Sequence, residues 1–297
     1  MPANLDIQIR DPFVLPVAST KTYCLFGTTD PDCWKGPGTG FDVYTGSDLE
    51  HWEGPVPAFR PEAGFWGTTN FWAPEAHVYR GSHYLFATFK ADGACRGTQI
   101  LTADRPQGPY RMHSAGPVTP RDWGCLDGTL HVDCDGLPWI VFCHEWTQVH
   151  DGEICAVRLS ENLSRPLGKP RLLFRGSEAP WTRPIGRRGA PADPVDRVTD
   201  GPFLHRTANG TLLMLWSSFS ETGYAMGVAT SVSGNVEGPW LQSEHPMIEK
   251  DAGHGMIFRA FDGRLMITVH TPNRTPDERR VFREVVERGG TLTLAGE

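Results

Sequence analysis

The chain has 297 residues and a formal net charge of −7, with a sequence pI near 5.9. This acidic balance, without a cluster of Lys or Arg, argues against a nucleic-acid partner, because such proteins usually carry a basic stripe. The 33 Gly and 25 Pro residues are typical of many short strands joined by tight turns. We therefore expect an all-β protein that forms a single domain over residues 1–297.

The first residues, MPANLDIQIRDPF, lack the basic and apolar regions of a signal peptide, and no apolar run along the chain is long enough to span a membrane. We therefore expect a cytoplasmic protein, or a secreted one if a signal peptide has been removed, with no membrane partner. The seven cysteines form no C-x-x-C pair, and several lie within apolar runs. This pattern predicts buried, reduced thiols rather than zinc ligands.

One sequence unit recurs five times along the chain. Each copy opens with an acidic residue or a His, continues as an apolar strand, turns at a polar tip and returns as a second apolar strand. The copies begin at Asp11, Glu75, Asp127, Asp200 and His254, which are 64, 52, 73 and 54 residues apart. This spacing is expected for one four-stranded antiparallel sheet per copy.

Turn signals support this division. The tips RGSH (80–83), CDGLP (134–138), TANGT (207–211) and FDGR (261–264) predict tight hairpins. Three later stretches end in Gly-Pro, which predicts a turn between the third and fourth strands of a copy. We therefore predict a five-bladed β-propeller around a central pocket. A β-sandwich is the alternative, but it would scatter the five opening residues.

Carboxyl groups that converge in such a pocket repel one another, so at least one of them should stay protonated near neutral pH. Glycoside hydrolysis uses this arrangement. One carboxylic acid protonates the leaving oxygen, while a carboxylate activates water or attacks directly. The opening residues of the copies therefore point to a glycosidase.

Nearly the whole chain resembles glycoside hydrolase family 43, whose members are five-bladed propellers that act on arabinose- and xylose-containing glycans by inversion. The resemblance depends on the order and spacing of five short motifs. They are Ile9-Arg10-Asp11-Pro12-Phe13, Trp72-Ala73-Pro74-Glu75, Leu126-Asp127-Gly128-Thr129-Leu130, Thr199-Asp200-Gly201-Pro202 and Gly253-His254-Gly255.

The resemblance implies that Asp11 is the general base and that Asp127 orients the general acid and raises its pKa. The family usually has Glu-Gly-Pro at the head of the fourth blade, whereas this chain has Asp200-Gly201-Pro202. The shorter side chain would place its proton roughly 1.5 Å further from the glycosidic oxygen. Three candidates for the general acid therefore stay open, namely Asp200, Glu145 and, less favoured, Glu178.

By the same resemblance, Glu75 serves substrate binding or pocket structure, and His254 lies on the axis near a bound cation or water. No cofactor is required. If an ion is present we expect Ca²⁺ or Na⁺ held through water, because no His, Cys and carboxylate set has the spacing of a transition-metal site. Sugar rings stack on flat side chains, and Trp72 and Trp146 are the aromatic residues that we assign to substrate binding. Trp66, Phe71 and Trp181 are further candidates.

We expect an inverting, exo-acting hydrolase that releases terminal furanosyl units from plant or microbial glycans, in the manner of an α-L-arabinofuranosidase. A β-xylosidase, a galactofuranosidase, a transglycosylase or phosphorylase, and an inactive glycan-binding propeller are the alternatives. The segment 174–199, rich in Arg and Pro, is expected to form a rim of the pocket.

Overall fold

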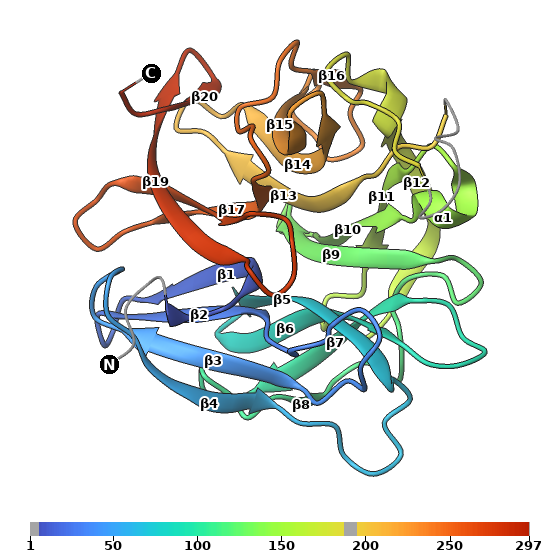
Figure 1. Ribbon diagram of the computed structural model, residues 1–297, viewed down its shortest axis with the longest axis vertical. Helices are drawn as coiled ribbons and strands as arrows, with labels where there is room; N and C mark the ends of the chain where they lie inside the picture. Colours follow the sequence, from blue (N-terminus) through green and yellow to red (C-terminus); the bar gives the residue numbers. More distant parts are fainter. Residues whose placement is uncertain (1–5, 187–194, 297) are drawn as a thin grey trace.

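The computed structural model describes residues 6–186 and 195–296. These residues form five antiparallel sheets of four strands each, and each sheet is made of four consecutive strands. The sheets are arranged as blades around a central axis, with β1, β5, β9, β13 and β17 nearest the centre (Figure 1). The predicted five-bladed propeller is therefore confirmed.

The strands of the five blades follow in chain order. The first blade contains β1 (Arg10–Val17), β2 (Thr22–Thr28), β3 (Phe41–Gly46) and β4 (Glu53–Phe59). The second contains β5 (Thr69–Tyr79), β6 (Ser82–Lys90), β7 (Gly97–Ala103) and β8 (Arg111–Met112). The third contains β9 (Cys125–Val132), β10 (Pro138–His144), β11 (Glu153–Leu159) and β12 (Pro166–Arg175). The fourth contains β13 (Asp200–Arg206), β14 (Leu212–Ser220), β15 (Gly223–Ser231) and β16 (Trp240–Gln242). The fifth contains β17 (Gly253–Arg259), β18 (Leu265–Thr271), β19 (Arg279–Arg288) and β20 (Thr291–Leu294).

The helical elements α1 (Trp146–Val149) and η2 (Gly176–Glu178) are a single α-helical turn and a 3₁₀ turn. Each of the four predicted hairpin tips joins the first and second strands of its blade. Two of the three Gly-Pro pairs lie between the third and fourth strands as predicted, whereas Gly54-Pro55 lies just inside β4.

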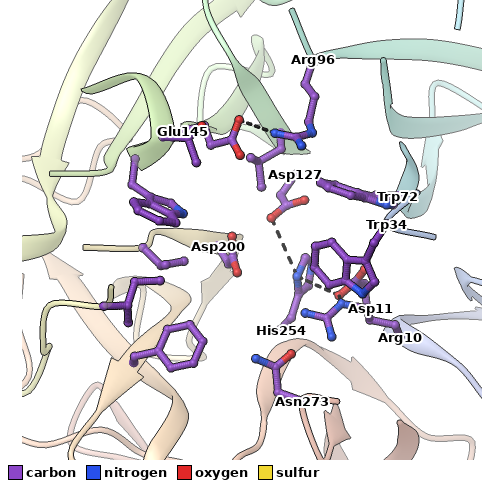
Figure 2. A pocket seen from close by; sticks show the side chains of 16 residues that line it. Arg10, Asp11, Trp34, Trp72, Arg96, Asp127, Glu145, Asp200, His254 and Asn273 are labelled. Carbon is purple, nitrogen blue, oxygen red and sulfur yellow. Dashed lines mark hydrogen bonds and ion pairs between the residues drawn. The ribbon is translucent and has the colours of Figure 1, made fainter. Parts of the chain in front are cut away.

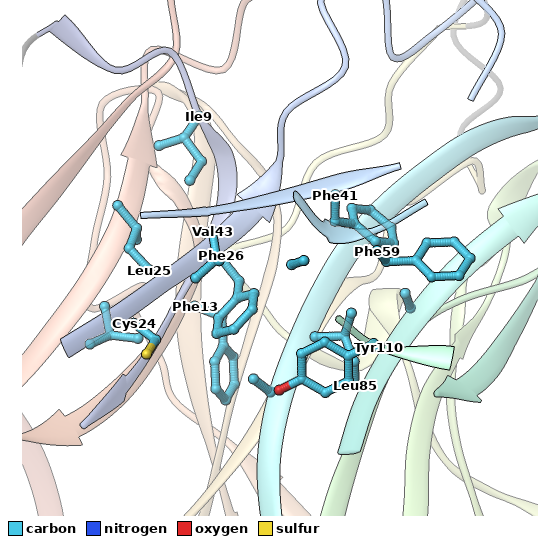
Figure 3. Close-up of a cluster of buried hydrophobic side chains, with 14 of the residues drawn as sticks. Ile9, Phe13, Cys24, Leu25, Phe26, Phe41, Val43, Phe59, Leu85 and Tyr110 are labelled. Carbon is cyan, nitrogen blue, oxygen red and sulfur yellow. The ribbon is translucent and has the colours of Figure 1, made fainter. Parts of the chain in front are cut away.

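Apolar residues fill the spaces between neighbouring blades. On β14, Leu213 and Leu215 pack toward the fifth blade, while Met214 and Trp216 pack toward the third. Both faces of such a strand are buried, which is why its sequence is a continuous apolar run rather than an alternating one. Between the first and second blades the filling is largely aromatic, because Phe41 and Phe59 of the first blade (Figure 3) each pack against Phe71 and Phe89 of the second.

The first and last blades meet through a buried ion pair. Arg10 Nη1 lies 3.2 Å from Glu278 Oε1, and the Glu278 side chain has no exposed surface. Backbone contacts reinforce the closure, because Ile9 N donates to Glu278 O at 3.2 Å and Gln8 forms a bridge with Arg279. Since the two ends of the chain must meet to close the ring, this junction stabilises the whole propeller.

A Glu278→Ala substitution should therefore destabilise the protein by about 3–5 kcal/mol, because it removes the nearer of the two carboxylates that pair with the buried Arg10 guanidinium. The measurement is the urea midpoint of unfolding followed by tryptophan fluorescence. Glu161→Ala is the matched control, since it removes an exposed pair with Arg80 at 2.8 Å and should leave the midpoint unchanged. Equal midpoints for the two variants would contradict the closing role.

Every inner strand carries the same β-bulge near the axis. In β1 two residues, Asp11 and Pro12, lie between the paired positions Arg10 and Phe13, while the partner strand has one residue there. The other four inner strands show the same shift in register. The first residue of each bulge has a positive φ, and these residues are Asp11 (53°), Ala73 (44°), Asp127 (55°), Gly201 (50°) and His254 (45°). The bulges bend the strands and re-aim these residues around the axis.

Candidate active site

The bulges correct the predicted equivalence of the five opening residues. Asp11, Asp127 and His254 do take equivalent places, as the first residue of a bulge. Asp200 lies one residue earlier, in the place that Arg10 has in the first blade. Glu75 lies two residues after the bulge residue of its blade, in the place of Phe13. The repeat was found correctly, but its register was wrong in two blades.

A pocket opens at the axis, with a cavity volume of about 290 Å³. The residues that line it come from all five blades and their connections. They are Arg10, Asp11, Trp34, Trp72, Arg96, Leu126, Asp127, Glu145, Trp146, Thr147, Ile185, Val198, Asp200, Phe219, His254 and Asn273. Figure 2 shows Asp11, Asp127 and Asp200 gathered around His254, with the Glu145 and Arg96 pair at another edge of the pocket.

His254 is buried between carboxylates, which favour the charged form of its ring. Its Nδ1 lies 3.1 Å from Asp11 Oδ1 and 3.8 Å from Asp127 Oδ2. Burial opposes a charge on the imidazole, but Asp11, Asp127 and Asp200 outweigh it and raise the pKa of His254. The ring also packs against Gly201, where a Cβ atom would come within 2.7 Å of it. A glycine is therefore needed there for steric reasons as well as for its φ of 50°.

Asp11 is held in its ionised form. Burial alone would raise the pKa of this carboxyl group, but the charges of His254 and Arg10 keep it below its ordinary value. Thr28 Oγ1 adds a hydrogen bond to Asp11 Oδ2 at 2.7 Å. Behind it, His270 accepts a hydrogen bond from Asp11 N at Nδ1, and burial lowers the pKa of His270 to about 3, so this ring is neutral.

Asp127 and Asp200 behave in the opposite way. Burial raises the pKa of both carboxyl groups above the ordinary value, and the negative charge of Asp11 adds to the effect on each. Asp127 Oδ2 accepts a hydrogen bond from Gly201 N at 3.0 Å, and Asp200 Oδ2 accepts one from the Tyr224 hydroxyl at 3.1 Å. The charge of Asp200 also raises the pKa of Asp127, so the two buried acids titrate together and the pair retains a proton near neutral pH.

The pocket therefore contains a carboxylate that can accept a proton and a pair of carboxyl groups that can donate one. Its walls add flat apolar surface. Trp34 lies edge-on to Trp72, with ring centroids 5.1 Å apart, and Arg96 lies over the Trp72 ring at 4.5 Å. Acid and base groups between aromatic walls suit a reaction in which proton transfer accompanies bond cleavage in a sugar.

The family model "Glycosyl hydrolases family 43" matches residues 5–287 of this sequence. The chain belongs to this family. Members of family 43 are glycosidases that hydrolyse glycosidic bonds, so the resemblance inferred from the five motifs is confirmed.

A solved family 43 relative, described as an endo-arabinase from Bacteroides thetaiotaomicron, is 41% identical and has a TM-score of 0.90 over 97% of this chain and 98% of its own. A curated relative from Cellvibrio japonicus, named as an extracellular exo-α-(1→5)-L-arabinofuranosidase, is 26% identical over 47% of this chain and 44% of its own length. An extracellular endo-α-(1→5)-L-arabinanase of Bacillus subtilis is 22% identical over 46% of this chain and 45% of its own. The matches thus span under half the length of both curated relatives.

The structure brings most of the predicted site residues together. Asp11, Asp127, Asp200, Glu145, Trp72, Trp146 and His254 all line the pocket. Glu75 is not among the lining residues, and its Oε2 lies 3.0 Å from His77 Nε2. Glu178 is also outside the lining, where its carboxylate accepts a hydrogen bond from Arg175 N at 2.8 Å within η2. Glu145 forms an ion pair with Arg96.

The remaining aromatic candidates serve packing. Phe71 packs against Phe89 in the core, Trp181 packs against Trp216, and Trp66 donates its ring N–H to Gln99. From the expected rim, Ile185 and Val198 line the pocket, whereas residues 187–194 lie outside the described residues.

Arg10, Trp34, Arg96, Phe219 and Asn273 line the pocket but were not predicted. Arg10 was recoverable, because the register of the bulges places it level with Asp200. Phe219 lies near the end of β14, the second strand of the fourth copy, whereas Trp34, Arg96 and Asn273 lie in connections, where the repeat carries no signal.

Within residues 6–186 and 195–296, no group of three His, Cys, Asp or Glu side chains is placed to hold a metal ion. Because His254 is itself cationic, it is poorly suited to bind an ion directly, and an ion held through water stays a prediction. No helix of the described chain is long and apolar enough to cross a bilayer. The cytoplasmic location also stays a prediction, since both curated relatives are named extracellular.

The raised pKa of Asp127 predicts how stability depends on pH. In the unfolded chain Asp127 releases its proton above about pH 4, whereas in the folded protein it keeps the proton until the pH reaches its raised pKa. The contribution of Asp127 to the free energy of unfolding therefore falls as the pH rises from about 4 toward that pKa. Asp127→Asn removes this titration. The urea midpoint of the variant relative to the original protein should therefore increase between about pH 5 and about pH 8. A difference that stays constant with pH would show that Asp127 is ionised in the folded protein.

Proposed function

We propose that this protein is an inverting, exo-acting hydrolase of α-L-arabinofuranosyl linkages, with a terminal unit of an oligosaccharide or polysaccharide side chain as substrate. The observation that carries the proposal is that Asp11, Asp127 and Asp200 line one pocket, where the pKa of Asp11 is lowered by its cationic neighbours and the pKa values of Asp127 and Asp200 are raised by burial. The choice of arabinose is supported by the three relatives above, which are named as an endo-arabinase, an arabinofuranosidase and an arabinanase.

In this proposal Asp11 is the general base and Asp200 the general acid. The ionised carboxylate of Asp11 takes a proton from water as that water attacks the anomeric carbon. Asp200 protonates the glycosidic oxygen as the bond to the leaving group breaks. Asp127, fixed by Gly201 N, orients the acid and shares its proton. Asp200 is preferred over Glu145 because burial raises the pKa of Asp200, whereas the Glu145 carboxylate is paired with the Arg96 guanidinium.

The size of the cavity supports action on a small terminal unit. At about 290 Å³ it lies at the low end of small-molecule sites. The aromatic rings of Trp72, Trp34 and Trp146 can cover the apolar faces of one sugar ring. Arg96 and Asn273 supply polar groups that can bind hydroxyl groups.

Internal cleavage is the second candidate, and one observation favours it. A further cavity, of about 370 Å³, adjoins the pocket through Arg96, Glu145 and Thr147, which line both. A glycan that extended from the pocket into this second cavity could be cut at an internal bond. The 41% identical relative is named as an endo-arabinase.

Asp11→Asn should abolish hydrolysis of a nitrophenyl α-L-arabinofuranoside, because the carboxamide cannot accept a proton. Circular dichroism and the urea midpoint serve as the controls for folding. Full activity of this variant would overturn the proposal. Binding of arabino-oligosaccharides by the original protein without release of product would instead identify a glycan-binding propeller.

The general acid can be identified from the leaving group. Asp200→Asn should reduce turnover of natural arabino-oligosaccharides by at least about a hundredfold, but should cost far less on a dinitrophenyl glycoside, whose leaving group needs no proton. Glu145→Gln is the matched control and should affect both substrates equally. If Glu145→Gln shows the selective loss instead, Glu145 is the acid.

Products distinguish the mode of action. Proton NMR at the start of the reaction should show the β-anomer of arabinose as the first product from an α-linkage, since inversion reverses the anomeric centre. Chromatography of an arabinan digest should show monosaccharide from the outset. Early formation of oligosaccharides of mixed length would assign internal cleavage, and initial α-anomer would contradict inversion.

A further inference from the structure

Hydrogen bonds from the bulges join neighbouring blades around the axis. In four of the junctions, the first residue of a bulge donates its backbone N–H to a side chain on the second strand of the preceding blade. Ala73 donates to Thr28 Oγ1 at 2.9 Å, Asp127 to Thr88 Oγ1 at 2.9 Å, His254 to Ser217 Oγ at 2.8 Å, and Asp11 to His270 Nδ1 at 3.2 Å.

The four acceptors occupy one equivalent position. Each of them is paired with the residue that precedes the bulge of its own blade, as Thr28 is with Arg10. In the third blade this position is Cys143, which is paired with Leu126. The fifth junction differs accordingly, because Gly201 N donates to Asp127 Oδ2 at 3.0 Å.

The first blade shows what a hydroxyl does at this position. The Thr28 hydroxyl accepts the N–H of Ala73 and donates to Asp11 Oδ2 at 2.7 Å, so it lies between the next blade and the carboxylate. By the same register, a hydroxyl at position 143 would face the N–H of Gly201 and the carboxyl group of Asp127, in addition to the side chain of Thr199, which already interacts with the thiol. A thiol is a weak donor and a weak acceptor. Cys143 is fully buried, and burial raises the pKa of its thiol, so it stays neutral.

We propose that Cys143 is a positioning residue for the reaction: by placing a thiol where the other blades have a hydroxyl or an imidazole, it leaves Gly201 N to bind Asp127 directly and leaves Asp127 without the hydroxyl donor that Asp11 has. This inference depends on the proposed function, in which Asp127 orients the acid and shares its proton. The thiol thereby separates the roles of two aspartates that occupy the same place in their blades.

The titratable and charged groups that face Asp127 come from the elements packed around β9. They are His254 on β17, Asp11 and Arg10 on β1, Asp200 on β13, Tyr224 on β15 and Cys143 on β10. Of these positions, only 143 can gain a hydroxyl donor to Asp127 without a change in the charge of the cluster.

Hydrogen bonds to a carboxylate favour its ionised form. Cys143→Ser should therefore lower the pKa of the Asp127 and Asp200 pair, so that the acid loses its proton at lower pH. In the profile of kcat/KM against pH, the acid is required below its pKa and activity is lost as the pH rises through it. The alkaline limb should move down by about one pH unit, and activity above it should fall about tenfold.

Two further variants separate this effect from a loss of packing. Cys143→Ala removes the thiol without adding a donor, so the alkaline limb should stay in place even if the protein is less stable. Cys155→Ser puts a hydroxyl in place of another buried thiol of the third blade, on β11 within the apolar cluster between the second and third blades. It should lower stability and leave the limb in place.

The carboxyl titration of the folded protein, followed by ¹³C NMR with labelled Asp, gives a readout that needs no activity. The high-pKa carboxyl signals should move to lower pH in Cys143→Ser and in neither of the other variants. An unchanged titration in Cys143→Ser, or an equal shift in Cys143→Ala, would overturn the inference. A shifted titration in a protein that hydrolyses no arabinoside would refute the proposed function and leave the role of Cys143 at Asp127 intact.

Discussion

The bulge at the head of each inner strand is the constraint on which the pocket depends. Side chains of a regular strand alternate between its two faces, so in a propeller they would all point into the spaces between blades. One additional residue per strand interrupts this alternation and directs Asp11, Asp127 and His254 toward the axis. The same residues join the blades, because their N–H groups bind across the junctions. The bulge residues therefore both carry the side chains of the pocket and hold neighbouring blades together.

Burying three carboxyl groups side by side is tolerated because their charge is compensated locally. Arg10 and His254 supply positive charge, and the retained proton of the Asp127 and Asp200 pair reduces the negative charge that remains. Arg10 is itself held by Glu278 at the closure of the ring. The Arg10 guanidinium therefore interacts both with the carboxylate of Asp11 in the site and with Glu278 at the junction of the first and last blades, so it contributes to the site and to the stability of the fold.

Much of this architecture was accessible from the sequence, because five copies of one hairpin pattern at regular spacing predict blades. The register of the site was less accessible. In the sequence, Asp11 and Asp200 look equivalent, because each opens its copy shortly before a proline. In the structure the bulge begins at Asp11 in the first blade but at Gly201, the residue after Asp200, in the fourth. Glu75 comes after Pro74 rather than before it. Its carboxylate pairs with His77 and does not line the pocket. Trp34 and Arg96 come from connections, whose course depends on tertiary packing rather than on a repeating pattern.

Because the additional residue recurs at the same height in every blade, the protein should tolerate changes of length very unevenly. Insertions at the outer hairpins would leave the direction of every axial side chain unaltered. A single deletion within an inner strand would turn its functional group into the space between blades and withdraw an N–H from the neighbouring blade. Near the axis the number of residues in each inner strand is therefore fixed, whereas insertions in loops or permuted termini can be accommodated at the periphery of the propeller.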